Sequence, residues 1–252
     1  MRYLLLLLAV LGGPARAVAA ERQLSVAAAA NLKPALDELV RAFEARRPEV
    51  KVRVTYGASG AFFAQIQSGA PLDLFFSADR DYPQRLVAAG LAADEVVYAI
   101  GRLALWVPAG SSLDVERRGL AALADPAVRK VAIANPALAP YGRAAEGALR
   151  AAGVLDAVRP KLVLGTSVAQ AAQFAVTGAA DAALVPRSLA SSPELAVAGR
   201  SVPLPDGLAP PIEQSAVVLS GARSPGLARD LLAFARGADG RRILARHGYA
   251  LP

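Results

Sequence analysis

The sequence contains no cysteine and a single histidine among its 252 residues. Without cysteine, the protein can form no disulfide bond, no thiolate metal site, no cysteine nucleophile and no lipid anchor on an N-terminal cysteine. The one histidine, His247, cannot build a metal cluster, and no Gly-x-Ser-x-Gly motif accompanies it. We therefore interpret His247 as a surface or helix-end residue, and predict that the chain is not an enzyme and has no metal or cofactor.

Long apolar runs are also scarce, and the only marked one stands at the N-terminus. Arg2 precedes the apolar run Tyr3–Leu11, which is too short to span a bilayer as a stable anchor. Ala17-Val18-Ala19 has the small-x-small pattern of a signal-peptidase site. We predict a signal peptide over residues 1–19, with cleavage after Ala17 as second choice; an uncleaved anchor or a buried helix is the alternative. The mature protein is then soluble and periplasmic.

The basic charge does not favour a nucleic-acid partner. The formal charge is +7, and about +5 remains once the signal peptide leaves. The arginines are scattered, and many stand near acids, as Arg41, Arg46 and Arg47 do around Glu44. No aromatic residues are interleaved with a basic stripe, so we interpret these charges as a solvated surface and predict no nucleic-acid binding.

Strand and helix signals alternate along the mature chain. The predicted strands cover 24–29, 50–56, 73–76, 96–100, 103–107, 131–134, 162–164, 181–185 and 216–219. Helical spacing predicts one helix between the first two strands and others at 61–68, 82–89, 142–152, 168–176 and 225–237. Segment 201–211 has four prolines and is predicted to be a stiff surface connection. Such alternation indicates an α/β fold with parallel sheets, which bind ligands at the carboxyl ends of their strands.

Neutral polar residues stand at several strand-to-helix junctions, namely Ala30-Asn31, Ser59, Pro140-Tyr141-Gly142 and Thr166-Ser167-Val168. Asn31 is a favoured N-cap residue, and Ser167 and Gln170 are spaced as a capping box. Helix N-termini carry free N–H groups and a positive partial charge, which suit an anion. Four such ends facing one cleft would make an anion site without formal charge. From spacing alone, plain helix capping is the more economical interpretation.

Longer segments resemble one known family. They include LSVAAAANLKPAL at Leu24–Leu36, YGASGAFFAQI at Tyr56–Ile66 and, most specifically, SGAPLDLFFSAD at Ser68–Asp79. Further matches are Tyr98–Val107, Asn135-Pro136, Pro140–Ala145, Val168–Gly178, Leu184–Ser188 and Ile243–Pro252. In order and over nearly the whole mature chain, the sequence resembles the periplasmic molybdate-binding proteins of ABC transporters.

The resemblance implies the type II periplasmic-binding-protein fold. Each of its two lobes is a mostly parallel sheet flanked by helices, and two crossover strands join the lobes around a ligand cleft. Lobe I would comprise residues 23–102 plus 213–252, and lobe II residues 103–212. The implied ligand is molybdate or tungstate, the implied partner is a membrane permease, and we expect a monomer. Another oxyanion, such as sulfate or phosphate, or a small organic anion is the alternative ligand; an exported enzyme and a sensory domain are other readings.

The resemblance also implies a ligand site that falls on the junctions named above, at Ala30, Asn31, Ser59, Tyr141 and Val168. Asn31 would donate from its side-chain amide, and Ser59 from its hydroxyl and backbone N–H. Tyr141 and Val168 would donate mainly from the backbone. Ala30 departs from the family pattern, because a Thr or Ser hydroxyl is common there. Pro186 stands where another branch has a ligand-contacting Tyr, so we leave it out of the site.

Overall fold

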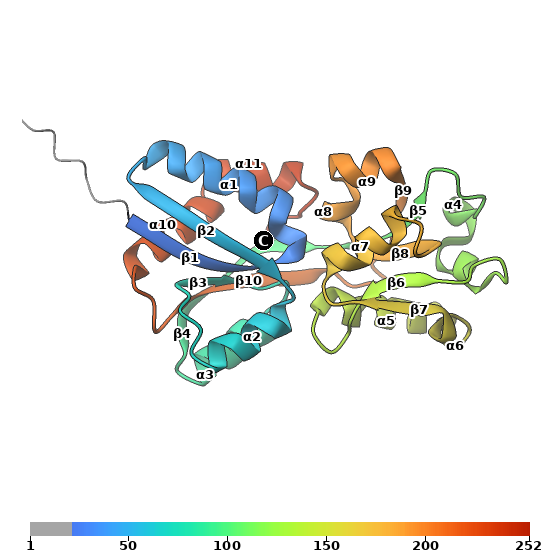
Figure 1. Cartoon of the computed structure of the whole chain (residues 1–252), viewed down its shortest axis with the longest axis horizontal. Coiled ribbons are helices and arrows are strands. Elements are labelled where there is room, and N and C mark those ends of the chain that lie inside the picture. Colours follow the sequence, from blue (N-terminus) through green and yellow to red (C-terminus); the bar gives the residue numbers. More distant parts are fainter. Residues whose placement is uncertain (1–21) are drawn as a thin grey trace, which may run out of the picture.

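The computed structural model describes residues 22–252, so the predicted signal peptide and its cleavage sites lie outside the described residues. The chain forms two five-stranded sheets, each flanked by helices (Figure 1). Within the described range, no helix is long and apolar enough to cross a membrane. The predicted two-lobed α/β fold is confirmed.

The first sheet holds the N-terminal strands and one late strand. Its order is β2 (Val50–Gly57), β1 (Arg22–Ala29), β3 (Leu74–Phe76), β10 (Ile212–Leu219) and β4 (Ala92–Gly101). Its helices are α1 (Lys33–Arg46), α2 (Ser59–Gln67), α3 (Asp81–Ala88), α10 (Pro225–Arg236) and α11 (Ala238–Arg246), with the 3-10 turn η1 (Ala30–Leu32) before α1.

The side chains of β1 contact two layers of helices, one on each face of the sheet, because successive strand residues point to opposite faces. Val26 and Ala28 pack into the cluster that α1, α10 and α11 cover, whereas Ala27 packs into the cluster that α2 and α3 cover. β1 is therefore buried on both faces, as its continuous apolar run predicts.

The second sheet is built from the middle of the chain. Its order is β7 (Leu162–Gly165), β6 (Val131–Ala134), β8 (Ala182–Pro186), β5 (Leu103–Pro108) and β9 (Gly199–Pro203). The surrounding helices are α4 (Val115–Arg118), α5 (Pro140–Ala151), α6 (Leu155–Val158), α7 (Val168–Val176), α8 (Arg187–Ala190) and α9 (Pro193–Ala198), with 3-10 turns η2 (Gly119–Ala124) and η3 (Arg159–Lys161). The chain passes between the sheets twice, at Arg102 and over residues 204–211.

Both sheets are mixed, and in each of them four of the five strands run in one direction, as the expected mostly parallel sheets require. The strands β2, β1 and β3 pair in parallel, as do β7, β6 and β8. The other two pairings in each sheet are antiparallel. The reason is that one strand in each sheet, β10 in the first and β5 in the second, runs against the other four and pairs antiparallel with both of its neighbours.

The structure departs from the expected elements at two places. Part of the predicted surface connection is β9, whose residues 199–203 pair with β5 despite the nearby prolines. Proline is tolerated here because β9 is an edge strand. The helix α11 follows α10 almost without a break and has no predicted counterpart; its apolar face, with Ile243 and Leu244, is buried against the first sheet's helices.

Candidate functional site

All five residues of the predicted site line one cavity between the two sheets. Its wall consists of Ala29, Ala30, Asn31, Gly57, Ala58, Ser59, Ala78, Ala139, Pro140, Tyr141 and Val168. These residues follow β1, β2 and β3 or stand at the starts of α5 and α7, so the cavity lies at the carboxyl ends of strands, as the sheet rule predicts. The cavity is small, because the centre of a water molecule could move within only about 10 Å³ of it. The two lobes therefore meet closely around it. Pro186 is not part of the wall.

Three helices begin at this cavity. Ser59 and Val168 are the first residues of α2 and α7, and Tyr141 is the second residue of α5. The N–H groups of a first helical turn have no acceptor within the helix. Within residues 22–252, none of these three N–H groups donates to another part of the backbone. The helix starts therefore offer free donors and a positive partial charge to the cavity.

Local sequence signals set the two helix starts in the second lobe. Pro140 is the first residue of α5, where its missing N–H costs little. Ser167 caps α7: its Oγ accepts from the Gln170 N–H at 3.3 Å. Gln170 Oε1 in return accepts from the Thr166 N–H at 2.7 Å, so the predicted capping box forms with its return bond one residue earlier. Helix α5 also needs Gly142, because a Cβ there would lie 2.2 Å from the Ala134 carbonyl oxygen.

Ser59 is poised to donate from its side chain as well. The residue is buried, and its Oγ accepts from the Ala78 N–H at 3.0 Å. A hydroxyl has one proton and can accept at the same time. The Ser59 hydroxyl therefore keeps its proton for an acceptor in the cavity.

Asn31 does not have the helix-capping role predicted from its position. It lies inside the 3-10 turn η1, and the cap positions around it are Ala29 and Leu32. Its Nδ2 instead donates to Gln214 Oε1 at 2.9 Å and to the Tyr249 hydroxyl at 2.8 Å. The expectation fails because distant residues hold this side chain. In the part of the chain that the structure describes, Asn31 Oδ1 is a buried side-chain oxygen without a hydrogen-bond partner.

Gln214 is the centre of a buried network that sequence patterns do not reveal. Its Oε1 lies 3.0 Å from the Tyr98 hydroxyl, which also lies 3.0 Å from the Ser77 carbonyl oxygen. Its Nε2 donates to the Tyr141 hydroxyl of the second lobe at 2.9 Å. Burial raises the pKa of the Tyr98, Tyr141 and Tyr249 hydroxyls, so each keeps its proton. From Gln214 onward β10 is buried on both of its faces, and nothing local in its sequence indicates the partners of Gln214.

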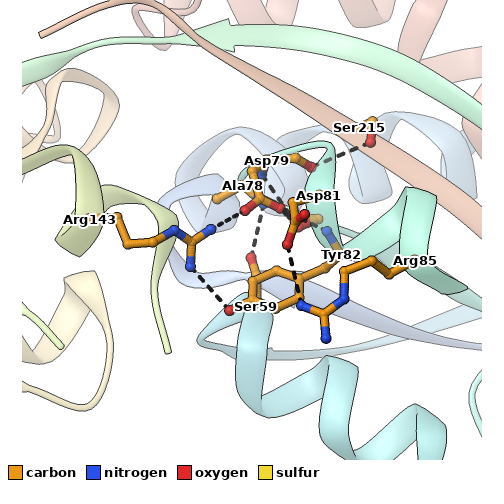
Figure 2. Close-up of polar contacts among 9 residues, drawn as sticks. Ser59, Ala78, Asp79, Asp81, Tyr82, Arg85, Arg143 and Ser215 are labelled. Atoms are coloured by element: carbon orange, nitrogen blue, oxygen red, sulfur yellow. Dashed lines mark hydrogen bonds and ion pairs between the residues drawn. The ribbon is translucent and has the colours of Figure 1, made fainter. Parts of the chain in front are cut away.

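A second set of contacts joins the lobes beside the cavity (Figure 2). Arg143 on α5 forms an ion pair with Asp79 and donates to the Tyr82 hydroxyl at 3.1 Å. Ser77 Oγ donates to Asp79 Oδ1 at 3.0 Å. Burial raises the pKa of Asp79, against the opposing effects of Ser77 and Arg143. We call Arg143, Asp79 and Tyr82 the interlobe clamp.

A backbone hydrogen bond lies next to the clamp. The Gly60 N–H donates to the Leu138 carbonyl oxygen across the lobes at 2.8 Å. A Cβ at Gly60 would lie 2.8 Å from that oxygen and 2.6 Å from the Tyr82 hydroxyl oxygen. Glycine is therefore required for this close approach of the lobes.

The chemistry of the cavity is that of a donor-rich, uncharged pocket. None of the residues in its wall is charged. Among the described residues, no group of three or more His, Cys, Asp or Glu could hold a metal ion. His247 lies away from the cavity at the end of α11, with Nε2 2.9 Å from Glu38 Oε2, as a helix-end residue. Such a pocket can hold a small anion that only accepts hydrogen bonds.

Comparison with known proteins agrees with this geometry. The family described as bacterial extracellular solute-binding protein matches residues 24–250. The chain is 34% identical to the molybdate-binding protein ModA of Azotobacter vinelandii over 248 residues, which cover 97% of each chain. It is 34% identical to ModA of Rhodobacter capsulatus over 233 residues, covering 92% of this chain and 89% of that protein.

A solved structure gives the same result. The periplasmic molybdate-binding protein of Azotobacter vinelandii superposes with a TM-score of 0.84 at 32% identity, covering 91% of this chain and 99% of that one. Fold and site thus define a two-lobed binding protein for a small solute. The chain belongs to the bacterial extracellular solute-binding protein family, and the relatives from Azotobacter vinelandii and Rhodobacter capsulatus bear the name of molybdate-binding protein.

Proposed function

We propose that this chain is an exported binding protein that captures molybdate, and also tungstate, and delivers it to the permease of an ABC transporter. The observation that carries the proposal is the convergence of Ala30, Asn31, Ser59, Tyr141 and Val168 on one uncharged cavity lined by N–H and hydroxyl donors. Two relatives at 34% identity bear the name of molybdate-binding protein, which supports this ligand.

The chemistry of the ligand matches that of the cavity. Molybdate and tungstate are dianions with four oxygens and no proton at neutral pH, so they only accept hydrogen bonds. Each hydrogen bond to a charged acceptor contributes roughly 1.5–3 kcal/mol. The free N–H groups of Ser59, Tyr141 and Val168 and the Ser59 hydroxyl would supply several of them. Sulfate has the same charge and shape, so the size of the closed cavity must discriminate against it.

Closure of the lobes would couple binding to delivery. We assign lobe I to residues 23–102 plus 213–252 and lobe II to residues 103–212, with the cavity and the interlobe clamp between them. A bound anion that recruits donors from both lobes favours the closed form. The permease would then recognise the closed form. We further propose that the mature protein is a periplasmic monomer without enzymatic activity, released by cleavage after Ala19.

Calorimetric titration of ligand-stripped mature protein tests the proposal. Molybdate, tungstate, sulfate and phosphate are added in turn to the same preparation. We expect tight one-to-one binding of the first two and no heat from the others. Preference for sulfate or phosphate would overturn the assigned ligand while leaving an oxyanion-binding function, and silence from all four would overturn both.

A further inference from the structure

The protons of the buried hydrogen-bond network around Gln214 and Asn31 do not all have acceptors when the two amides are oriented as described above. The Tyr98 hydroxyl has one proton for two acceptors, the Ser77 carbonyl and Gln214 Oε1. The Tyr141 hydroxyl accepts from Gln214 Nε2, and the described residues offer its own proton no acceptor. Asn31 Oδ1 is left as a buried acceptor without a donor. A buried polar atom without a partner is costly, and a dianion without protons cannot supply a donor for Oδ1, so this arrangement is unfavourable when such an anion is bound.

Turning over both side-chain amides gives the Tyr98 and Tyr141 hydroxyl protons one acceptor each and leaves Asn31 Nδ2 for a bound anion. The Tyr249 hydroxyl then donates to Asn31 Oδ1, and Ser188 Oγ serves the Asn31 carbonyl oxygen. An amide keeps nearly the same shape when its oxygen and nitrogen exchange places. With Gln214 turned, its Nε2 donates to the Tyr98 hydroxyl, which gives its proton to the Ser77 carbonyl, and its Oε1 accepts from the Tyr141 hydroxyl. The second Nε2 proton then goes to Asn31 Oδ1, provided that Asn31 is turned as well. The same heavy-atom distances, 2.9–3.0 Å, serve both arrangements.

The two arrangements differ in what Asn31 leaves for the cavity, whose wall it helps to form. In the first, Nδ2 is committed to Gln214 and Tyr249, and the unpartnered atom is an acceptor. In the second, that position holds Nδ2, a donor. A dianion without protons repels the first and attracts the second. The carbonyl oxygen of Asn31 keeps a donor in either case, since it lies 2.8 Å from the Tyr249 hydroxyl and 3.2 Å from Ser188 Oγ.

We propose that Gln214 is a positioning residue that turns the Asn31 amide so that Nδ2 faces the anion, and that this orientation lets the site prefer fully deprotonated oxyanions over protonated ones. A protonated anion such as hydrogen phosphate needs an acceptor for its proton. In the turned arrangement Asn31 Oδ1 no longer faces the cavity, so this acceptor is missing. The inference rests on the proposed oxyanion-binding function and adds to it a discrimination by protonation, independent of the size of the ion.

The test compares two substitutions that move the orientation in opposite directions. Gln214→Met removes the amide that fixes Asn31, so Asn31 can present either atom. Tyr249→Phe also removes a buried hydroxyl bonded to Asn31. That hydroxyl can both accept from Nδ2 and donate to the Asn31 carbonyl oxygen only in the first arrangement, so its loss favours the second. Molybdate affinity is measured by calorimetry, and hydrogen phosphate affinity by displacement of bound molybdate at high phosphate concentration, at about pH 8, where both ions are dianions.

In Gln214→Met we expect molybdate affinity to fall about tenfold while hydrogen phosphate affinity does not fall, so the preference drops about tenfold or more. In Tyr249→Phe both affinities fall together or the preference grows. Equal losses for both ions in Gln214→Met, or a lost preference in Tyr249→Phe, would overturn the inference. If wild-type protein prefers sulfate to molybdate, sulfate replaces molybdate in the same comparison; if it binds no oxyanion, the proposed function and this inference fail together.

A readout independent of affinity is the NMR signal of the Asn31 side-chain NH₂ group in ¹⁵N-labelled protein, assigned by its loss in Asn31→Asp. Exchange of bound molybdate for tungstate should shift both of its protons, because they face the anion. The Gln214 NH₂ protons, which bond Tyr98 and Asn31, should move much less. Asn31 NH₂ protons whose chemical shifts do not change on this exchange would contradict the turned amide.

Discussion

The two walls of the cavity present donors in different ways. The first-lobe wall uses side chains: the Ser59 hydroxyl, fixed by the Ala78 N–H, and the Asn31 amide, fixed by Gln214 and Tyr249. The second-lobe wall uses the backbone at the starts of α5 and α7, where the side chain of Val168 is apolar and that of Tyr141 bonds Gln214. Side-chain identity should therefore decide affinity on one wall and helix placement on the other.

The largest single effect is expected from Ser59→Ala on the first-lobe wall. The substitution removes a hydroxyl donor to the anion and leaves the buried Ala78 N–H without its acceptor. We expect molybdate affinity to fall about tenfold to a hundredfold by calorimetry. Ser188→Ala is the matched control, because it removes another buried hydroxyl near Asn31 that is not part of the cavity wall. If both variants lose affinity equally, the cause is a general loss of order around the cavity rather than the loss of a donor to the anion.

The next effect concerns the close approach of the two walls. Gly60→Ala would place a methyl group 2.8 Å from the Leu138 carbonyl oxygen of the opposite lobe. Closure then strains the contact, and we expect a loss of about tenfold in molybdate affinity. Small-angle X-ray scattering with saturating ligand should show a more open average shape.

Gly147→Ala is the control for this glycine. It lies within α5, and a Cβ there meets no atom within 4 Å. We expect unchanged affinity and a gain of about 0.5–1 kcal/mol in the free energy of unfolding. A tenfold loss of affinity in this variant too would show that any added methyl near α5 disturbs the site.

The interlobe clamp should have a smaller effect, because the Arg143 side chain is 42% exposed. We expect Arg143→Met to weaken molybdate binding about threefold to fivefold. The substitution also removes a group that lowers the pKa of Asp79, so that pKa rises further. A raised pKa in the folded chain stabilises at acid pH, and this contribution is lost as the pH rises through it. Urea unfolding should therefore show a larger destabilisation by Arg143→Met at about pH 7.5 than at about pH 5; equal values would contradict an ion pair.

The walls also differ in how far sequence alone predicts them. Pro140 and the pair Ser167 and Gln170 are local signals, and they mark the starts of α5 and α7 within two residues. Convergence of the five site residues follows from the rule that parallel strands end at one edge, together with the family resemblance. The mixed direction of the sheets does not follow, because nothing in an apolar run shows which way a crossover strand pairs.

Long-range contacts are the part that local patterns miss. Asn31 is of a residue type favoured at N-caps, yet its hydrogen-bond partners Gln214 and Tyr249 lie more than 180 positions away in the sequence. The same holds for Arg143 and Asp79, which are 64 positions apart on different lobes. Only folding brings these groups together, so the positioning network and the clamp emerge from the structure.

The smallest effect is expected from Val168→Ala on the second-lobe wall. The substitution shortens a buried apolar side chain but keeps the N–H at the start of α7, so molybdate affinity should change less than about threefold. Val168→Pro is the informative counterpart. Proline fits the first helical position, and Ser167 already has the extended backbone that a following proline requires. This variant loses the N–H donor as well as the valine side chain, whose effect Val168→Ala reports, so calorimetry should show a loss of about tenfold. If Val168→Ala is the more damaging of the two, the side chain rather than the backbone binds on this wall, and the contrast between the walls is wrong.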